Sequence, residues 1–139
     1  MYLLDTDTLT LFHHGQPRIV ERVRQAGEEN VGTTVISEIE ILQGRHAFLL
    51  KASDGEQVLR AQDLLQRSKY LLAHIAVVLV DAASAAELLK LWQIKKLKQI
   101  GRADLLIASI ALARRDTLVT RNVRHFRQIP GLKIEDWAD

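Results

Sequence analysis

Residues 1–12 read MYLLDTDTLTLF, and their polarity changes abruptly at residue 5. The apolar run Tyr2-Leu3-Leu4 predicts a short buried strand, and Asp5 and Asp7 follow it directly. An aspartate between a strand and a helix often serves as the helix N-cap. Asp7 fits that role better than Asp5, which stands at the very end of the strand. We therefore interpret Asp5 as a functional residue and expect Asp7 to cap the helix and line the same site.

Short apolar runs alternate with longer helical patterns along the rest of the chain. Strands are expected at 31–36, 75–80, 118–120 and 132–134, and helices at 8–14, 18–26, 37–50, 56–72, 82–99 and 103–115. Strands separated by helices indicate parallel crossovers, so we expect an α/β fold with helices on both faces of the sheet. A length of 139 residues suits a single domain, residues 1–139.

Composition restricts the classes of function. The chain has no cysteine, which excludes disulfides, thiolate zinc sites and cysteine nucleophiles. No signal peptide is visible, and the longest apolar run, 75–80, is too short to cross a membrane, so we expect a cytoplasmic protein. The net charge is only +2, but basic residues gather in two runs. These runs are either solvated helix faces or a positive rim for nucleic acid; they comprise Lys90, Lys95, Lys96, Lys98 and Arg102, and Arg114, Arg115, Arg121, Arg124 and Arg127.

Acidic and amide side chains follow several of the expected strands. Asp5 follows the first strand, Glu38 and Glu40 follow the second, Asn122 follows the 118–120 strand, and Asp104 begins the helix before that strand. The carboxyl ends of parallel strands lie at one edge of a sheet, where ligands bind. Carboxylates gathered there repel one another unless a cation or a shared proton lies between them. Oxygen ligands without cysteine or paired histidines favour Mg²⁺ or Mn²⁺.

Two of these acids also have ordinary structural explanations. Ser37 and Glu40 match a capping box, and the residues alone leave Glu40 open between a cap and a ligand. Asp104 in the first turn of an apolar helix is favoured by the helix dipole. Neither explanation accounts for three elements that each bring a carboxylate to the same end of a sheet.

The stretch Asp5-Thr6-Asp7-Thr8 also resembles the haloacid-dehalogenase phosphatases. In that family the first aspartate attacks phosphorus and the second acts as acid and base. Such an enzyme also needs a later lysine and a late pair of acids, whereas the segment GRADLLIAS around Asp104 contains one acid. We keep this phosphatase as the alternative function.

Five motifs in order resemble the PIN-domain family, and within it the VapC-like toxins of toxin–antitoxin pairs. They are LLDTD, SEIEILQG, IGRADLLIASIALARR, LVTRNVRHF and IPGLKIEDW, and they span essentially the whole chain. The resemblance implies a Rossmann-like parallel sheet of about five strands. It also implies a metal-dependent endoribonuclease that cleaves RNA to 5′-phosphate and 3′-hydroxyl ends. A catalytically inactive PIN-fold binding module is a further alternative.

The resemblance assigns roles to particular residues. It implies that Asp5, Glu40 and Asp104 hold Mg²⁺ or Mn²⁺, that Asn122 completes the catalytic set, and that Thr6, Asp7 and Thr120 line the site. The nearest basic residues, Lys98, Arg102, Arg121 and Arg124, would contact RNA. Asn122 and His125 stand where many relatives have acids, and the lower negative charge predicts one firmly bound metal ion.

The resemblance also implies partners. We expect a homodimer and a small VapB-like antitoxin that covers the active edge, inserts an Arg or Lys among the carboxylates, and binds the helices at 8–26 and 42–72. Operator DNA would be bound only through that antitoxin.

Overall fold

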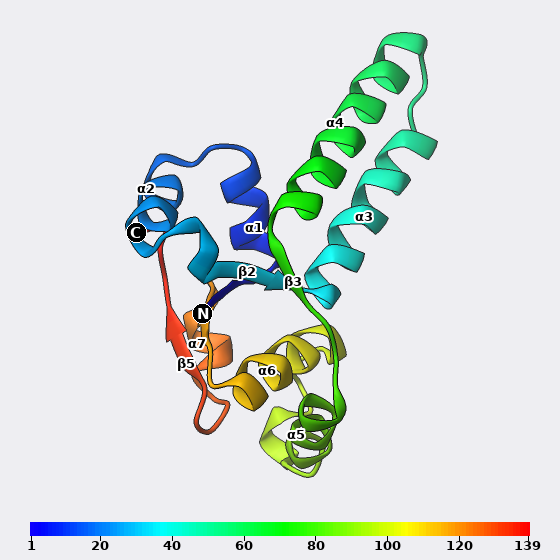
Figure 1. The fold of residues 1–139 in the computed structure, drawn as a ribbon. Coiled ribbons are helices and arrows are strands. Elements are labelled where there is room, and N and C mark those ends of the chain that lie inside the picture. Colours follow the sequence, from blue (N-terminus) through cyan, green and yellow to red (C-terminus); the bar gives the residue numbers. More distant parts are fainter.

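The computed structural model describes all 139 residues, and its centre is a five-stranded parallel sheet (Figure 1). The strand order is β3-β2-β1-β4-β5, and every neighbouring pair is parallel. The expectation of a parallel α/β sheet is confirmed. The strands are β1 (Tyr2–Leu4), β2 (Val31–Thr34), β3 (Ala76–Val78), β4 (Thr117–Val119) and β5 (Lys133–Glu135). β1 has the predicted bounds, β4 and β5 are each shifted by one residue, and β2 and β3 are shorter than predicted.

Seven α-helices and two 3₁₀ turns connect these strands. The helices are α1 (Thr6–His13), α2 (Pro17–Ala26), α3 (Val35–Leu50), α4 (Gly55–His74), α5 (Ala82–Trp92), α6 (Arg102–Arg114) and α7 (Val123–Phe126). The 3₁₀ turns are η1 (Glu28–Asn30) and η2 (Lys95–Leu97). The helix expected at 82–99 was wrong in its second half, because α5 ends at Trp92 and η2 follows. The short helix α7 was not predicted.

Two hydrophobic cores cover the two faces of the sheet. Adjacent residues of a strand point to opposite faces, so Leu3 packs with Leu118 against α5 and α6, whereas Leu4 packs with Val119 against α1 and α2. Figure 1 shows these two helical layers on either side of the strands. Because parallel strands are usually buried on both faces, their sequences are nearly continuous apolar runs.

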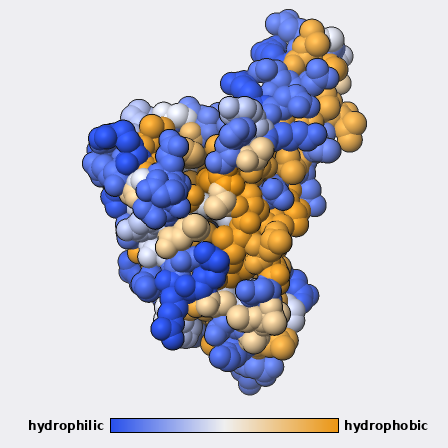
Figure 2. All heavy atoms as spheres, viewed as in Figure 1, coloured by the Kyte–Doolittle hydropathy of each residue, from blue (hydrophilic) through white to orange (hydrophobic).

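Helices α3 and α4 form an antiparallel hairpin that extends away from the sheet (Figure 1). Several large apolar side chains on it are exposed, among them Phe48, Leu50 and Leu59. Apolar atoms also gather along the middle of the face in Figure 2, and Leu79 and Val80, just after the edge strand β3, are exposed as well. No helix combines the length and the apolar character that a membrane span needs.

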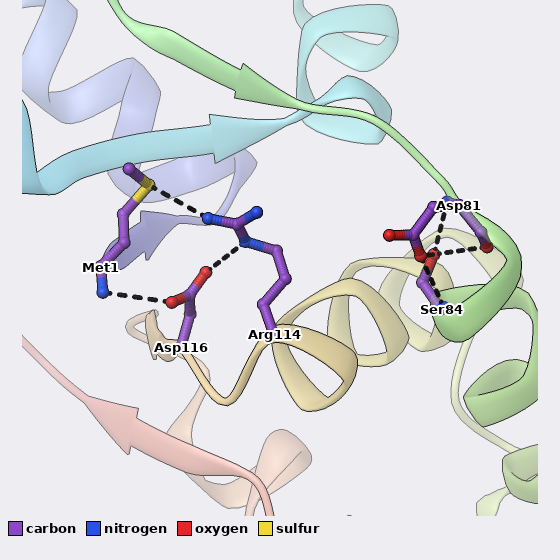
Figure 3. A network of polar contacts seen from close by, with 5 residues as sticks. All are labelled: Met1, Asp81, Ser84, Arg114 and Asp116. Atoms are coloured by element: carbon purple, nitrogen blue, oxygen red, sulfur yellow. Dashed lines mark hydrogen bonds and ion pairs between the residues drawn. The ribbon is translucent and has the colours of Figure 1, made fainter.

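The amino edge of the sheet is closed by ion pairs (Figure 3). The buried carboxylate of Asp116 accepts from the Met1 amine at 3.1 Å and from Nε of Arg114 at 2.6 Å. Figure 3 also shows the reciprocal cap of α5, in which Asp81 Oδ1 accepts from the Ser84 N–H and Ser84 Oγ accepts from the Asp81 N–H. The contacts of Asp116 fix the amino edge of the sheet, opposite the candidate site, whereas the α5 cap follows the carboxyl end of β3.

Candidate functional site

Asp5 lies where β1 passes into α1, and it is almost completely buried. Its Oδ1 accepts from the Thr8 N–H at 2.9 Å, so Asp5 is the N-cap of α1 and the assignment of that role to Asp7 was wrong. Asp5 is the single residue between β1 and α1, and it has the extended backbone of an N-cap. Asp7 already lies inside the helix.

The carboxyl group of Asp5 has no cationic partner. Burial raises its pKa, while hydrogen bonds from Thr120 and from the Thr8 backbone act in the opposite direction. Neighbouring Asp7 raises that pKa slightly further. A desolvated carboxylate with no cation beside it is suited to bind one.

Glu40 is held by a residue from the first strand–helix junction. Its Oε1 accepts from the hydroxyl of Thr6 at 2.6 Å, and Thr6 Oγ1 also lies 3.0 Å from Ser37 Oγ. Because Thr6 has one hydroxyl proton and gives it to the carboxylate, the Ser37 hydroxyl donates to Thr6. Glu40 Oε2 makes no hydrogen bond, so it is available to a ligand.

The capping-box explanation of Glu40 was wrong. Helix α3 begins at Val35, and its N-cap is Thr34, whose hydroxyl accepts from the Ser37 N–H at 3.2 Å. Ser37 therefore lies inside the first turn, and Glu40 is too far along the helix to reach the N-cap backbone. The side chain of Glu40 is directed to Thr6 instead. Glu38 makes no such contact with Thr6, which distinguishes the two acids of SEIE.

Asp104 lies in the first turn of α6, as expected, and is half-buried. Its Oδ2 lies 3.2 Å from Nε2 of His125, which comes from α7. This contact lacks hydrogen-bond geometry, so the buried Nε2 of His125 has no hydrogen-bond partner. The carboxylate of Asp104, in the first turn of α6, therefore lies beside the imidazole of His125 on α7.

Thr120 and Asn122 follow β4 at the same edge. The Asn122 N–H donates to Thr120 Oγ1 at 3.0 Å, and the Asn122 carbonyl accepts from the N–H groups of His125 and Phe126. The Asn122 side chain is exposed and caps nothing. A hollow of about 530 Å³ lies beside it, lined by Asp7, Thr10, Leu11, Arg121 and Asn122.

The structure brings the predicted residues to one edge without forming a finished metal site. Asp5, Glu40 and Asn122 all follow carboxyl ends of adjacent strands, and Asp104 begins the helix that packs beneath β4. No group of three or more Asp, Glu or His side chains is arranged to hold a metal ion. The oxygen ligands fit Mg²⁺ or Mn²⁺ in chemistry, most clearly at buried Asp5. Glu40 contacts Thr6 through Oε1 alone, and Asp104 contacts His125 through Oδ2.

The expected basic residues lie on two sides of this edge. Arg121 lines the hollow beside Asn122, and Arg124 is exposed on α7. Lys98 and Arg102 line a different, more apolar pocket between α5 and α6. Lys98 and Arg102 therefore lie in a different hollow from Arg121.

Two residues that contact the candidate site residues were not identified from the sequence. Ser37 was interpreted only as a cap, and His125 only as a replaced acid. The contacts of Ser37 with Thr6 and of His125 with Asp104 join segments distant along the chain, so no local periodicity signals them. For the start of α3, Thr34 was the available signal, since it is an N-cap residue type three residues before Ser37.

Comparisons with known proteins agree with this architecture. The PIN-domain family model matches residues 2–132. The chain is 30% identical over 140 residues to a protein named ribonuclease VapC1 from Haemophilus influenzae, covering 99% of this chain and 98% of that one. It is 26% identical over 137 residues to the tRNA(fMet)-specific endonuclease VapC of Salmonella typhimurium, covering 99% and 98% of the two chains.

Solved structures give the same result. DNA-bound VapBC from Salmonella typhimurium matches with a TM-score of 0.81 and 26% identity, covering 98% of this chain and 97% of that one. VapBC-1 from nontypeable Haemophilus influenzae matches with a TM-score of 0.74 and 28% identity, covering 99% and 98%. Sequence and overall fold therefore agree, and the chain belongs to the PIN-domain family, among its VapC-like proteins.

Proposed function

We propose that this chain is a divalent-metal-dependent endoribonuclease of the cytoplasm and the toxin of a toxin–antitoxin pair. The single observation that carries the proposal is the buried, cation-free carboxylate of Asp5, with Glu40 and Asp104 on the adjacent elements of the same edge. The relatives named as ribonuclease and as tRNA-specific endonuclease support the substrate class.

The residues divide the work in this proposal. Asp5, Glu40 and Asp104 hold Mg²⁺ or Mn²⁺, which when bound supplies Lewis-acid activation of water and stabilises charge on the phosphate. Thr6 orients Glu40 through its 2.6 Å hydrogen bond. Asn122 presents an uncharged amide oxygen that positions water or the phosphate. Arg121, in the hollow next to Asn122, attracts the RNA backbone.

The exposed apolar surface supports a protein partner. Val20 on α2 and Phe48, Leu59 and Tyr70 on the α3–α4 hairpin are exposed large side chains, more than an isolated enzyme needs. Three of the structural relatives are VapBC complexes, and two of these three are bound to DNA. We propose that a VapB-like antitoxin covers these helices and supplies the contact to operator DNA, and that two copies of the chain pair.

One assay separates this proposal from the phosphatase alternative. The protein is incubated with single-stranded RNA and, separately, with a small phosphate monoester, each in Mg²⁺ and in EDTA. We expect Mg²⁺-dependent cleavage of RNA to 5′-phosphate ends and no hydrolysis of the monoester. An Asp104→Asn variant processed in parallel controls for contaminating nucleases. Hydrolysis of the monoester without RNA cleavage would overturn the proposal.

A further inference from the structure

A second hollow, of about 340 Å³, lies between α5, η2 and α6. Its walls are mostly apolar, and its two polar contributors, Lys98 and Arg102, are both basic. Trp92 and Leu91 come from α5, Leu97 and Lys98 from the η2 segment, and Arg102 and Leu105 from α6. A volume of this size falls within the range of about 300–1,000 Å³ that small ligands occupy.

An aromatic–guanidinium pair marks its rim. The guanidinium carbon of Arg102 lies 4.6 Å from the ring centroid of Trp92, which is 38% exposed. No carboxylate pairs with Arg102. An indole face and a guanidinium plane are both surfaces on which a nucleobase stacks, and the free N–H groups of the guanidinium match a phosphate.

Charge around the hollow favours an anionic ligand. Residues 88–102 contain five cationic side chains and no anionic one. Lys90 is paired with Glu87, whereas Lys95, Lys96, Lys98 and Arg102 form no ion pair. An apolar segment of a protein partner would gain nothing from these unpaired cations. A nucleotide uses both the apolar walls and the charge.

The hollow adjoins the proposed catalytic edge. Arg102 and Asp104 share the first turn of α6, where successive residues rise by about 1.5 Å along the axis. Gln99, between Lys98 and Arg102, donates to Gln128 Oε1 at 3.2 Å, which connects this segment to the residues just after α7. His125 of α7 in turn contacts Asp104.

We propose that this hollow holds an unpaired base of the RNA strand close to the cleaved phosphate. The base stacks on Trp92 and Arg102, and Lys98 neutralises the adjoining phosphate. The inference rests on the proposed function for the identity of its ligand. It adds a base-holding subsite on α5 and α6 that is separate from the carboxylates.

Intrinsic fluorescence tests the subsite directly, because the chain has two tryptophans and Trp137 is buried. A short single-stranded oligoribonucleotide is titrated into the full chain in EDTA, so that binding is measured without cleavage. We expect saturable quenching. Trp92→Leu should abolish the quenching and raise the Kd, measured by anisotropy of labelled RNA, about tenfold, whereas Trp92→Phe keeps most of the affinity.

Two further variants keep the test decisive. Arg102→Gln should weaken binding and lower the slope of log Kd against log salt concentration by about one. Lys133→Gln removes an exposed cation at the start of β5, outside the hollow, and should leave the Kd unchanged. A folded Trp92→Leu or Arg102→Gln variant that binds RNA within twofold of the parent overturns the proposal. Inorganic phosphate alone should not quench; the full fluorescence change with phosphate would show an anion site and overturn it too.

Cleavage distinguishes this inference from the proposed function. If the parent cuts RNA and Trp92→Leu leaves kcat/KM unchanged, the subsite is wrong and the ribonuclease stands. If Trp92-dependent RNA binding is found but Mg²⁺ gives no cleavage, the subsite stands and the ribonuclease fails.

Discussion

Two carboxylates at opposite ends of the sheet have the same burial and different surroundings. Asp5 at the carboxyl end and Asp116 at the amino end are each 7% exposed. Asp116 accepts from two cations, Arg114 and the Met1 amine, whereas Asp5 accepts only from uncharged donors and its pKa is raised by burial. Removing one partner of a buried ion pair destabilises the fold, because the other charge is left uncompensated, whereas a buried carboxylate without a cation is available to a ligand.

The largest expected difference between these ends is in catalysis. Asp5→Asn keeps a side-chain cap for α1 and removes the charge, so RNA cleavage should fall by roughly 10⁴-fold, the scale for one member of a catalytic set. Asp104→Asn should behave alike. Asp116→Asn should cleave like the parent at temperatures where it is folded. Initial rates on a labelled RNA measure all three, and a rate for Asp5→Asn within tenfold of the parent would contradict the site.

For stability, the larger effect is expected at the amino end of the sheet, at Asp116. Asp116→Asn leaves Arg114 and the Met1 amine without their anion and should lower the free energy of unfolding by about 2 kcal/mol, because the carboxylate is buried although both cations are partly exposed. Asp63→Asn is the matched control, since it breaks an exposed ion pair with Arg67 at 3.0 Å and should cost less than about 0.5 kcal/mol. Urea unfolding measures both. Equal losses would remove the distinction between the two ends.

A substitution of Thr6 tests how Glu40 is positioned at the carboxyl end of the sheet. Thr6→Val removes the hydroxyl that holds Glu40 at 2.6 Å while preserving the shape of the side chain. Cleavage should fall about tenfold, the equivalent of one hydrogen bond to a charged group. Thr6→Ser keeps the hydroxyl and should retain most of the activity. If Val and Ser variants cut RNA equally well, Thr6 does not position Glu40.

Asn122 tests how much negative charge the catalytic end carries. Asn122→Asp adds a carboxylate at the exposed rim and should lower the Mn²⁺ concentration for half-maximal activity several-fold, because the added charge attracts the cation. Asn122→Ala should lower turnover less than loss of Asp5 does. An unchanged Mn²⁺ requirement for Asn122→Asp would show that residue 122 lies outside the metal's reach.

The smallest effect is on pH-dependent stability in metal-free buffer. Burial raises the pKa of Asp5, so the native state takes up a proton at a higher pH than the unfolded chain. The neutral carboxyl therefore favours folding below the ordinary pKa of 3.8, and this contribution is lost as the pH rises through the raised pKa. Asp5→Asn should melt above the parent at neutral pH, and the gap should narrow as the pH falls. A constant gap in Tm would contradict this cause.

Local pattern predicted the order of the larger elements but not several boundaries. The alternation of apolar runs and helical periods indicated every strand and the parallel sheet, because both signals are short-range. The end of α5 at Trp92 and the four-residue helix α7 escaped, since their lengths depend on packing against α6 and β5. Short helices owe their stability to such tertiary contacts.

The candidate site was predictable to the level of residue type and strand end. Asp5, Glu40, Asp104 and Asn122 follow from the rule that ligands bind at carboxyl ends of parallel strands, together with the family resemblance. The side chains that contact these residues could not be predicted from the same rule. The Thr6–Glu40 and Asp104–His125 contacts depend on which faces of separate helices meet, and that information is absent from any single segment.

The strand order has a consequence for synthesis on the ribosome. β1 is the central strand, yet Leu3 pairs on one side with Gly32 and on the other with Leu118. The first strand to emerge therefore remains half-paired until almost the whole chain has been translated, and closing so long a loop is slow. Asp5 and Asn122 reach the same edge in that final step. A nascent or truncated chain ending before β4 would carry Asp5, Glu40 and Asp104 but neither β4 nor Asn122, so the proposed catalytic site would not be assembled.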